Sequence, residues 1–164
     1  MQANPSPMNR IVSGGQAGVD RGALDAALAA GFPCGGWCPE GRKAEDGPIP
    51  DRYPLRELPG AGYRDRTIRN VRDSDATVIL HAGVVEGGTE LTLLACERIR
   101  RPHVLVDCSV NSAAEAAALL ARFVREHGIE CLNVAGPRES KWAGARDCAY
   151  RVISGALAEL TSSS

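Results

Sequence analysis

The sequence lacks any excess of charge of one sign, since 19 Lys and Arg residues stand against 20 Asp and Glu residues and the formal net charge is -1. Its overall field therefore does not favour nucleic acid or an anionic membrane surface as partners. No apolar stretch approaches the ~20 residues that span a bilayer. The first nine residues lack the basic start and apolar run of a secretory signal. We expect a cytoplasmic protein in which any anion site is local.

A metal site and a disulfide framework are not indicated either. Cys34 and Cys38 are close in sequence, but "CGGWC" has no partner pair, and a structural zinc site needs four converging ligands. We interpret the cysteines mostly as small buried apolar residues and predict no metal ligand in the protein. The six cysteines are Cys34, Cys38, Cys96, Cys108, Cys131 and Cys148.

Two nucleotide-binding fingerprints are missing as well. "SGGQAG", at residues 13–18, does not have the GxGxxG spacing of the dinucleotide fold, and the chain contains no GKS or GKT of a P-loop. The generic nucleotide folds therefore receive only weak support.

Strands alternate with helices along most of the chain. Helices are expected at residues 19–30, 63–73, 112–128 and 142–160, and after the glycines of the segment 83–101. Apolar strands are expected at 10–13, 76–82, 102–108 and 129–136. Residues 32–62, rich in Pro and Gly, predict at most short strands near 36–38 and 53–57. This pattern predicts an α/β fold, a single-domain, Rossmann-like, doubly wound and mostly parallel sheet with helices on both faces. We expect this domain to span residues 10–161, with a disordered segment at 1–9 and a frayed tail at 162–164.

Three glycine turns should meet at one rim of this sheet, because ligands bind outside the carboxyl ends of parallel strands. These turns are residues 14–18, 83–89 and 136–138. Glycine lets a ligand approach the backbone, and the unpaired amides at a helix start suit phosphate. The alternative is that the glycines only make tight turns from strand to helix.

Charged residues accompany these turns. Asp20 either complements the helix dipole, accepts hydrogen bonds from a ligand, or holds a loop through Arg21 or Arg66. The central loop offers donors for phosphate and acceptors for a heterocycle, although it is equally compatible with a solvated charged loop. Arg66, Arg69 and Asn70 can share one helical face.

The chain resembles the molybdenum cofactor carrier family, a branch of the Rossmann-like grouping that includes the Lonely Guy phosphoribohydrolases. The resemblance covers residues 11–160 and is carried by "SGGQAGVDRGALDAAL", "GGWCPEGRKAEDGPIPDRYPL", "YRDRTIRNVRDSDATVIL" and "GGTELTL". It implies a binding protein that holds molybdenum cofactor, a phosphorylated pterin, as cargo. In such carriers the cofactor itself holds the metal.

The resemblance also implies which residues form the ligand site, and none of them is assigned a catalytic role. Ser13 is included because it begins the "SGGQAG" turn, and not because of the resemblance. The implied cofactor-binding residues, with Ser13 included, are Ser13, Gly14, Gly15, Gln16, Gly18, Asp20, Lys43, Glu45, Asp46, Gly47, Arg66, Asn70, Gly87, Gly88 and Thr89.

The alternative is that the chain is a nucleotide-binding phosphoribohydrolase. A comparison of the motif of the Lonely Guy enzymes with this sequence tests it. Their PGGxGTxxE motif ends in a glutamate, whereas here Glu86 stands at the proline, and Leu94 or Thr92 stands at the final position, depending on the register. The missing glutamate favours a carrier over an enzyme, and a nucleotide sensor is a third possibility. The expected partners are a phosphorylated pterin or nucleotide, molybdoenzymes or cofactor-synthesis proteins, and further copies of the chain in a dimer or tetramer.

Overall fold

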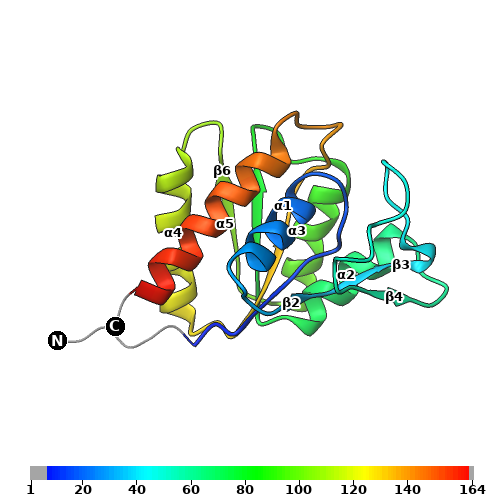
Figure 1. Ribbon diagram of the computed structural model, residues 1–164, viewed down its shortest axis with the longest axis horizontal. Coiled ribbons are helices and arrows are strands. Elements are labelled where there is room, and N and C mark those ends of the chain that lie inside the picture. The colour runs from blue at the N-terminus through cyan, green and yellow to red at the C-terminus, as the bar shows by residue number, and fades with distance from the viewer. Residues whose placement is uncertain (1–6, 163–164) are drawn as a thin grey trace.

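A five-stranded parallel sheet forms the centre of the protein. The structure is a computed structural model that describes residues 7–162. Its strands run in the order β2-β1-β7-β5-β6, and every neighbouring pair is parallel. The predicted alternation of strands and helices is confirmed (Figure 1). The strands of this sheet are β1 (Arg10–Val12), β2 (Cys34–Gly35), β5 (Ala76–His81), β6 (His103–Asp107) and β7 (Cys131–Ala135).

Helices cover both faces of the sheet. α1, α4 and α5 pack together on one face, and α2 packs against α3 on the other (Figure 1). Right-handed crossovers explain this cover, because connections that run in opposite directions along a parallel sheet lie on opposite faces. The predicted doubly wound, Rossmann-like fold is therefore confirmed. The helices are α1 (Val19–Ala29), α2 (Tyr63–Asp73), α3 (Gly87–Ile99), α4 (Ala113–His127) and α5 (Ala145–Ser162).

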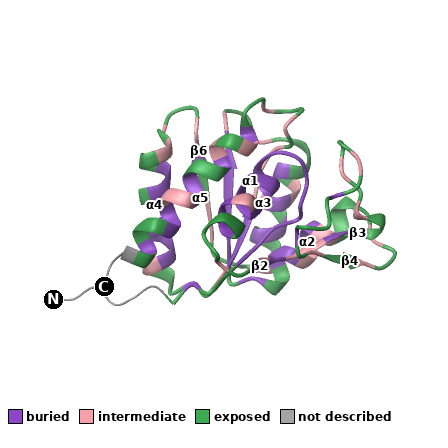
Figure 2. Ribbon diagram, in the orientation of Figure 1, coloured by how far each residue is buried: buried purple, intermediate pink, exposed green. Residues whose placement is uncertain are grey.

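Strand β5, which lies between β7 and β6, is buried along its whole length. Ile79 and Leu80 point to opposite faces because successive side chains alternate along a strand, and both are fully buried. Figure 2 shows buried residues along the strands and on the helix sides that face them. This burial is why the sequence of β5 has no polar alternation.

The strand that the sequence predicts near residues 36–38 lies at 37–39, and a bend at Gly36 separates it from β2. The φ of Gly36 is +131°, and a Cβ there would lie 2.1 Å from the carbonyl oxygen of Ser13. Only glycine fits such a position. Before the bend, β2 belongs to the main sheet, and after it β3 (Trp37–Pro39) pairs in parallel with β4 (Arg56–Leu58).

The strand predicted at residues 53–57 begins later than expected, in β4. The guanidinium of Arg42, the last residue of the short helical turn η1 (Glu40–Arg42), explains the shift. It donates hydrogen bonds to the carbonyls of Ile49, Pro50, Tyr53 and Leu55. A side chain, and not a neighbouring strand, therefore holds this part of the loop.

The last helix begins at Ala145, three residues after the predicted start at residue 142. Gly144 has a φ of +92°, which a right-handed helix does not allow. The carboxylate of Glu139 accepts hydrogen bonds from the N–H groups of Gly144 at 2.6 Å and Arg146 at 3.0 Å. Glu139 thus caps the helix from the preceding loop.

At the other end, the chain is already packed before residue 10. Met8 lies in the main core, and the N–H of Asn9 donates to the carbonyl of Glu130 at 2.8 Å. Of the segment predicted to be disordered, residues 1–6 lie outside the described residues, as do residues 163–164 of the predicted tail.

The described part of the chain contains no helix that combines the length and the apolar character of a membrane span. All six cysteines are free thiols; Cys38 and Cys96 are buried and the others are half-buried. Within residues 7–162, His, Cys, Asp and Glu side chains do not gather into a group that could hold a metal ion.

Candidate ligand-binding site

The sheet order opens a crevice above the end of β7. After β1 the chain turns to β2 on one side, and after β5 it turns to β6 on the other, so β7 lies between two diverging connections. This is the topological switch point at which open α/β sheets bind ligands. Loops that lie far apart in sequence therefore meet there, as the three predicted glycine turns indicated.

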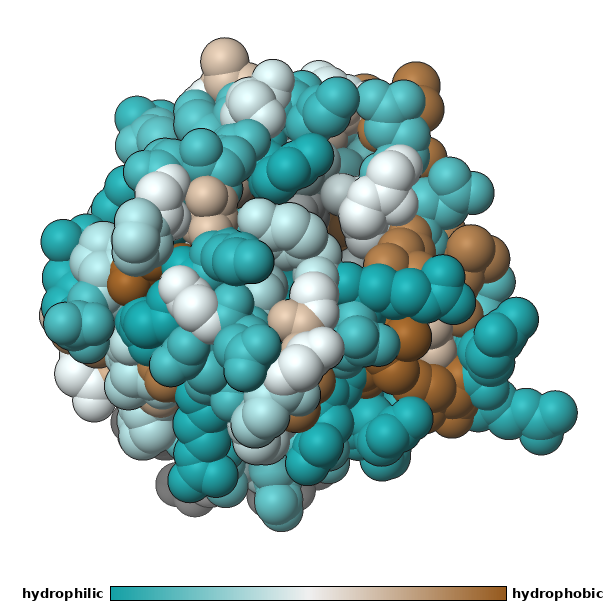
Figure 3. Space-filling view, turned by 90° about the vertical axis from the view of Figure 1, so that its right-hand side faces the viewer, coloured by the Kyte–Doolittle hydropathy of each residue, from teal (hydrophilic) through white to brown (hydrophobic). Residues whose placement is uncertain are grey.

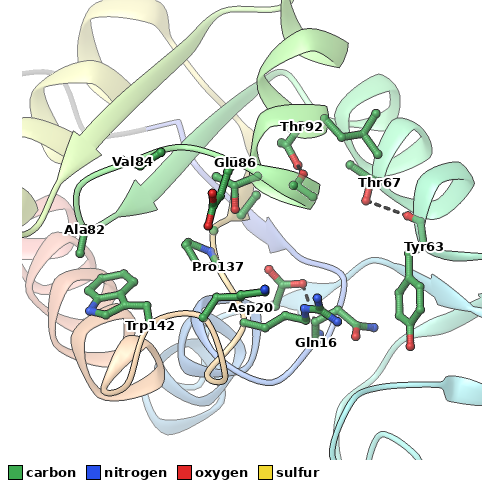
Figure 4. Close-up of a pocket in the computed structure, with 18 of the residues that line it drawn as sticks. Gln16, Asp20, Tyr63, Thr67, Ala82, Val84, Glu86, Thr92, Pro137 and Trp142 are labelled. Atoms are coloured by element: carbon green, nitrogen blue, oxygen red, sulfur yellow. Dashed lines mark hydrogen bonds between the residues drawn. The ribbon is translucent and has the colours of Figure 1, made fainter.

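A cavity of about 490 Å³ occupies this crevice. Its size lies within the range of small-molecule sites, roughly 300–1,000 Å³. In Figure 4, Trp142 lies beside Ala82 at one end, Gln16 and Asp20 lie toward the other, and Glu86 projects between them. Six predicted site residues line the cavity: Gln16, Asp20, Arg66, Gly87, Gly88 and Thr89.

The N-terminus of α3 opens into this cavity. Its N-cap residue Glu86 makes no side-chain capping bond, so the first amides of the helix remain available to a ligand. A Cβ added at Gly87 or Gly88 would meet nothing within 4 Å, which shows that the backbone here is openly approachable. With the helix dipole behind it, this end of α3 is suited to an anion.

Asp20 and Arg66 form a buried ion pair at the wall of the cavity. Arg66 Nη1 lies 3.5 Å from Asp20 Oδ2, and the two side chains are 14% and 6% exposed. Burial raises the pKa of Asp20, while Arg66 and the Gln16 N–H oppose that rise. Burial likewise lowers the pKa of Arg66, although a guanidinium remains charged at neutral pH. Asp20 therefore holds Arg66 by an ion pair, which was one of its predicted roles.

Gly14 makes room for this ion pair. A Cβ at Gly14 would lie 1.8 Å from Arg66 Nη1 and 3.0 Å from Asp20 Oδ2. The glycine therefore lets the guanidinium lie against the backbone of the first turn.

Gln16 presents a buried acceptor with no partner. Its Nε2 donates to the Lys43 carbonyl at 2.9 Å, which fixes the orientation of the amide, and its Oε1 has no hydrogen-bond partner. Arg66 Nε, a buried donor, is unpartnered in the same way. Each unsatisfied group of this kind costs about 1–3 kcal/mol. Such exceptions in a native protein call for an explanation, and both lie at the cavity.

The rest of the first glycine turn lies against protein. A Cβ at Gly15 would lie 2.3 Å from Leu55 Cδ1, and one at Gly18 would lie 2.5 Å from the Pro137 carbonyl oxygen. The hydroxyl of Ser13 donates to the carbonyl of Val134 at 2.7 Å. These residues bring the central loop and the loop after β7 against the first turn, and they stand behind the cavity wall.

The charged residues of the central loop also bind protein groups. Asp46 receives two hydrogen bonds from Arg21, at 2.5 and 2.9 Å. Glu45 accepts from the N–H and the hydroxyl of Ser140. Lys43 contributes its carbonyl to Gln16. Gly47, with a φ of +108°, turns the chain there.

Arg66, Arg69 and Asn70 were expected to share one face of α2, but the structure gives them different surroundings. Arg66 lies at the cavity, whereas Arg69 stacks on the ring of Trp37 at 4.7 Å and pairs with Asp73. Asn70 is buried and bonds both the N–H and the carbonyl of Trp37, at 2.8 and 2.9 Å. Asn70 thus holds β3 in place, away from the residues that line the cavity.

Several lining residues were not among the predicted site residues. The loop after β7 contributes Arg138, Lys141 and Trp142, and the N-terminal half of α2 contributes Tyr63 and Thr67. The residues after β7 had a usable signal, because "GPRESKW" follows the last of the predicted apolar strands and must lie at the same rim. Those of α2 had none, since their approach depends on how the central loop folds. The other additional lining residues are Ala82, Val84, Glu86, Leu91, Thr92, Ala135, Gly136 and Pro137.

The fold and the cavity at its switch point define a Rossmann-like ligand-binding protein. The family described as the circularly permutated YpsA SLOG family matches residues 11–157, and the chain belongs to that family. It is also similar to a crystal structure named as a "putative molybdenum carrier protein" from Syntrophus aciditrophicus SB. That likeness has a TM-score of 0.91 and 38% identity, and it covers 94% of this chain and 98% of that one. No curated protein matches significantly.

Proposed function

We propose that this chain is a carrier that binds a phosphorylated pterin, with molybdenum cofactor as its cargo. The carrier role is supported by the family and by the name of the similar crystal structure. The observation that carries the proposal is the uncapped N-terminus of α3, which faces a cavity of about 490 Å³ that Arg66 also lines.

The phosphate is assigned to the first turn of α3. The amides near Gly87 and Gly88 supply donors, and Arg66, Arg138 and Lys141 bring positive charge to the same cavity. The net charge of the chain is only -1, so this local concentration of donors provides the attraction. The first glycine turn supports the site from behind through Gly14.

The cargo is tested by producing the protein in a host that makes molybdenum cofactor and measuring the fluorescence of the oxidised pterin released from it. We expect about one pterin per chain and slower oxidation of added cofactor. Protein that carries no pterin and gives added cofactor no protection would refute the proposal.

The phosphate position is tested with Gly88→Asp, which places a carboxylate at the start of α3. The substitution has room to fold, because nothing lies within 4 Å of the added Cβ. We expect it to abolish pterin retention by repelling the phosphate. Gly31→Asp adds the same charge at the far end of α1, where nothing lies within 4 Å of the added Cβ. Its φ of +64° strains the backbone, so circular dichroism first checks that this control is folded, and it should then retain the pterin. Equal retention by the two variants would contradict the assignment.

A second candidate is a phosphoribohydrolase acting on nucleoside monophosphates. The observation that favours it is Asp20, a cavity carboxyl whose pKa burial raises, as a general acid requires. Incubation with a panel of nucleoside monophosphates would show release of free base, and no release from any of them removes this candidate. Binding of nucleotides without turnover would instead support a sensor.

We further propose that the chain acts in the cytoplasm, associates with itself, and meets molybdoenzymes or cofactor-synthesis proteins. Val84 and Leu94 support self-association, since they are 78% and 53% exposed near α3. Figure 3 shows hydrophobic side chains gathered at one side of a largely hydrophilic face. Light scattering after size exclusion should give a dimer or tetramer, and Leu94→Lys should reduce it to a monomer.

A further inference from the structure

Three polar groups at one part of the cavity offer a donor and two acceptors. Arg66 Nε is the donor, and Gln16 Oε1 is an acceptor; neither has a hydrogen-bond partner. Asp20 adds a carboxylate, 6% exposed, that lines the same cavity. In Figure 4, Gln16 and Asp20 lie close to each other on the same side of the cavity.

The orientation of the Gln16 amide is fixed by the protein. Its Nε2 donates to the Lys43 carbonyl at 2.9 Å. A flipped amide would place two carbonyl oxygens against each other and lose that hydrogen bond. Gln16 therefore keeps Oε1 as an unused acceptor, and Gln16 lines the same cavity as Arg66 and Asp20.

We propose that this part of the cavity recognises the amino-oxo edge of a bicyclic heterocycle, the edge that pterins and guanine share. That edge presents a carbonyl oxygen, a ring N–H and an exocyclic amine in a row. Arg66 donates to the carbonyl, Gln16 Oε1 accepts from the ring N–H, and Asp20 accepts from the amine. The inference rests on the proposed function, since it names the part of the cargo that lies away from the phosphate.

Adenine does not complement these three groups. It presents an amine and an unprotonated ring nitrogen, so Gln16 Oε1 would face an acceptor. Lumazine, a pteridine with a carbonyl in place of the pterin amine, would place that oxygen against Asp20. A site built to bond a particular polar group rejects analogues that lack it. The Gln16 and Arg66 atoms lie just beneath the cavity surface, so binding includes side-chain shifts of the kind common at binding sites.

The test measures affinity by calorimetry for two pairs of probes, GMP against AMP and pterin against lumazine. Each pair shares its remaining chemistry, and the nucleotides share the ribose phosphate. We expect GMP and pterin to bind about tenfold or more tightly than their partners. Equal affinities within both pairs overturn the inference while leaving the phosphate site intact. If none of the four probes, nor inorganic phosphate, binds, the proposed function fails with it.

Two variants separate recognition by Gln16 from a merely structural role. Gln16→Met removes the acceptor and the bond to Lys43, whereas Gln16→Glu removes that bond but keeps an oxygen acceptor. We expect the preference for GMP over AMP to fall in Gln16→Met, through weaker GMP binding and less repulsion of AMP, and to survive in Gln16→Glu. Equal loss of preference in both variants, with wild-type melting temperatures, shows that Oε1 does not read the ligand and overturns its role.

Discussion

Replacement of Gly14 by alanine is expected to break the Asp20–Arg66 ion pair from behind. The new Cβ would lie 1.8 Å from Arg66 Nη1, whereas ordinary contacts begin near 3.4 Å. The guanidinium must therefore retreat by about 1.5 Å or more. Since Nη1 is already 3.5 Å from Asp20 Oδ2, the retreat removes the contact.

The loss of the ion pair should lower the free energy of unfolding by about 1–3 kcal/mol at pH 7. Removing one partner of a buried pair costs about 3–5 kcal/mol, and the flexibility of Arg66 makes the full value an upper limit. The remaining carboxylate of Asp20 is buried beside fewer positive charges, so its pKa rises further above the ordinary value of 3.8.

The sign of the pH dependence follows from this rise. A carboxyl whose pKa is raised by folding binds protons more tightly in the folded protein, so its contribution to stability falls as the pH rises above about 4. The pKa of Asp20 is raised further in Gly14→Ala than in the wild-type protein. Its deficit relative to wild type should therefore be largest at neutral pH and shrink toward acid pH, as Asp20 takes up a proton in both proteins.

Urea unfolding followed by circular dichroism between pH 4 and pH 8 measures this deficit. Gly62→Ala is the matched control, because its φ is -95° and nothing lies within 4 Å of the added Cβ. Gly62 is the N-cap of α2, so we expect the control to lose up to about 1 kcal/mol, by the same amount at every pH. A Gly14→Ala deficit that is absent, or that grows toward acid pH, would refute the reasoning.

Three further substitutions test the supporting structure. Gly36→Ala should lower the unfolding free energy by about 3 kcal/mol or more, measured by urea unfolding, because its Cβ would lie 2.1 Å from the Ser13 carbonyl oxygen and its φ is +131°; near-wild-type stability would contradict this geometry. Asp46→Asn should cost about 0.5–1 kcal/mol at pH 7, allowing for its 49% exposed side chain. Because the hydrogen bonds from Arg21 lower the pKa of Asp46, that loss should fade as the pH drops below about 4, and a constant loss would argue against the ion pair. Ser112→Ala should lower stability by about 1 kcal/mol, checked by thermal unfolding, because the hydroxyl caps α4; no change would show that the cap is dispensable.

The main elements could be predicted because their causes are local in sequence. Tyr63–Asp73 forms a helix with the bounds expected from its pattern, and Ser112 caps α4 through Glu115 as its spacing predicted. The central loop was less predictable. Its strands depend on the bend at Gly36 and on the carbonyls that Arg42 binds, and both arise from contacts between distant residues.

The candidate site divides in the same way. The rule that ligands bind at strand ends correctly brought three glycine turns to one rim, because the order of strands and helices along the chain implies it. It could not show which turn faces open space. The backbone at Gly87 and Gly88 does, whereas that at Gly15 and Gly18 packs against protein.

The sequence alone therefore determined the parallel α/β fold, the family likeness and the rim at which ligands would bind, because periodicity and glycine placement act over a few residues. The tertiary structure decided which groups at that rim remain unused. Asp46 and Asn70 bond to Arg21 and Trp37, while Gln16 Oε1 and Arg66 Nε are left without partners. A polar side chain is available to a ligand only when no other part of the folded chain has satisfied it, and that depends on contacts among residues far apart in the sequence.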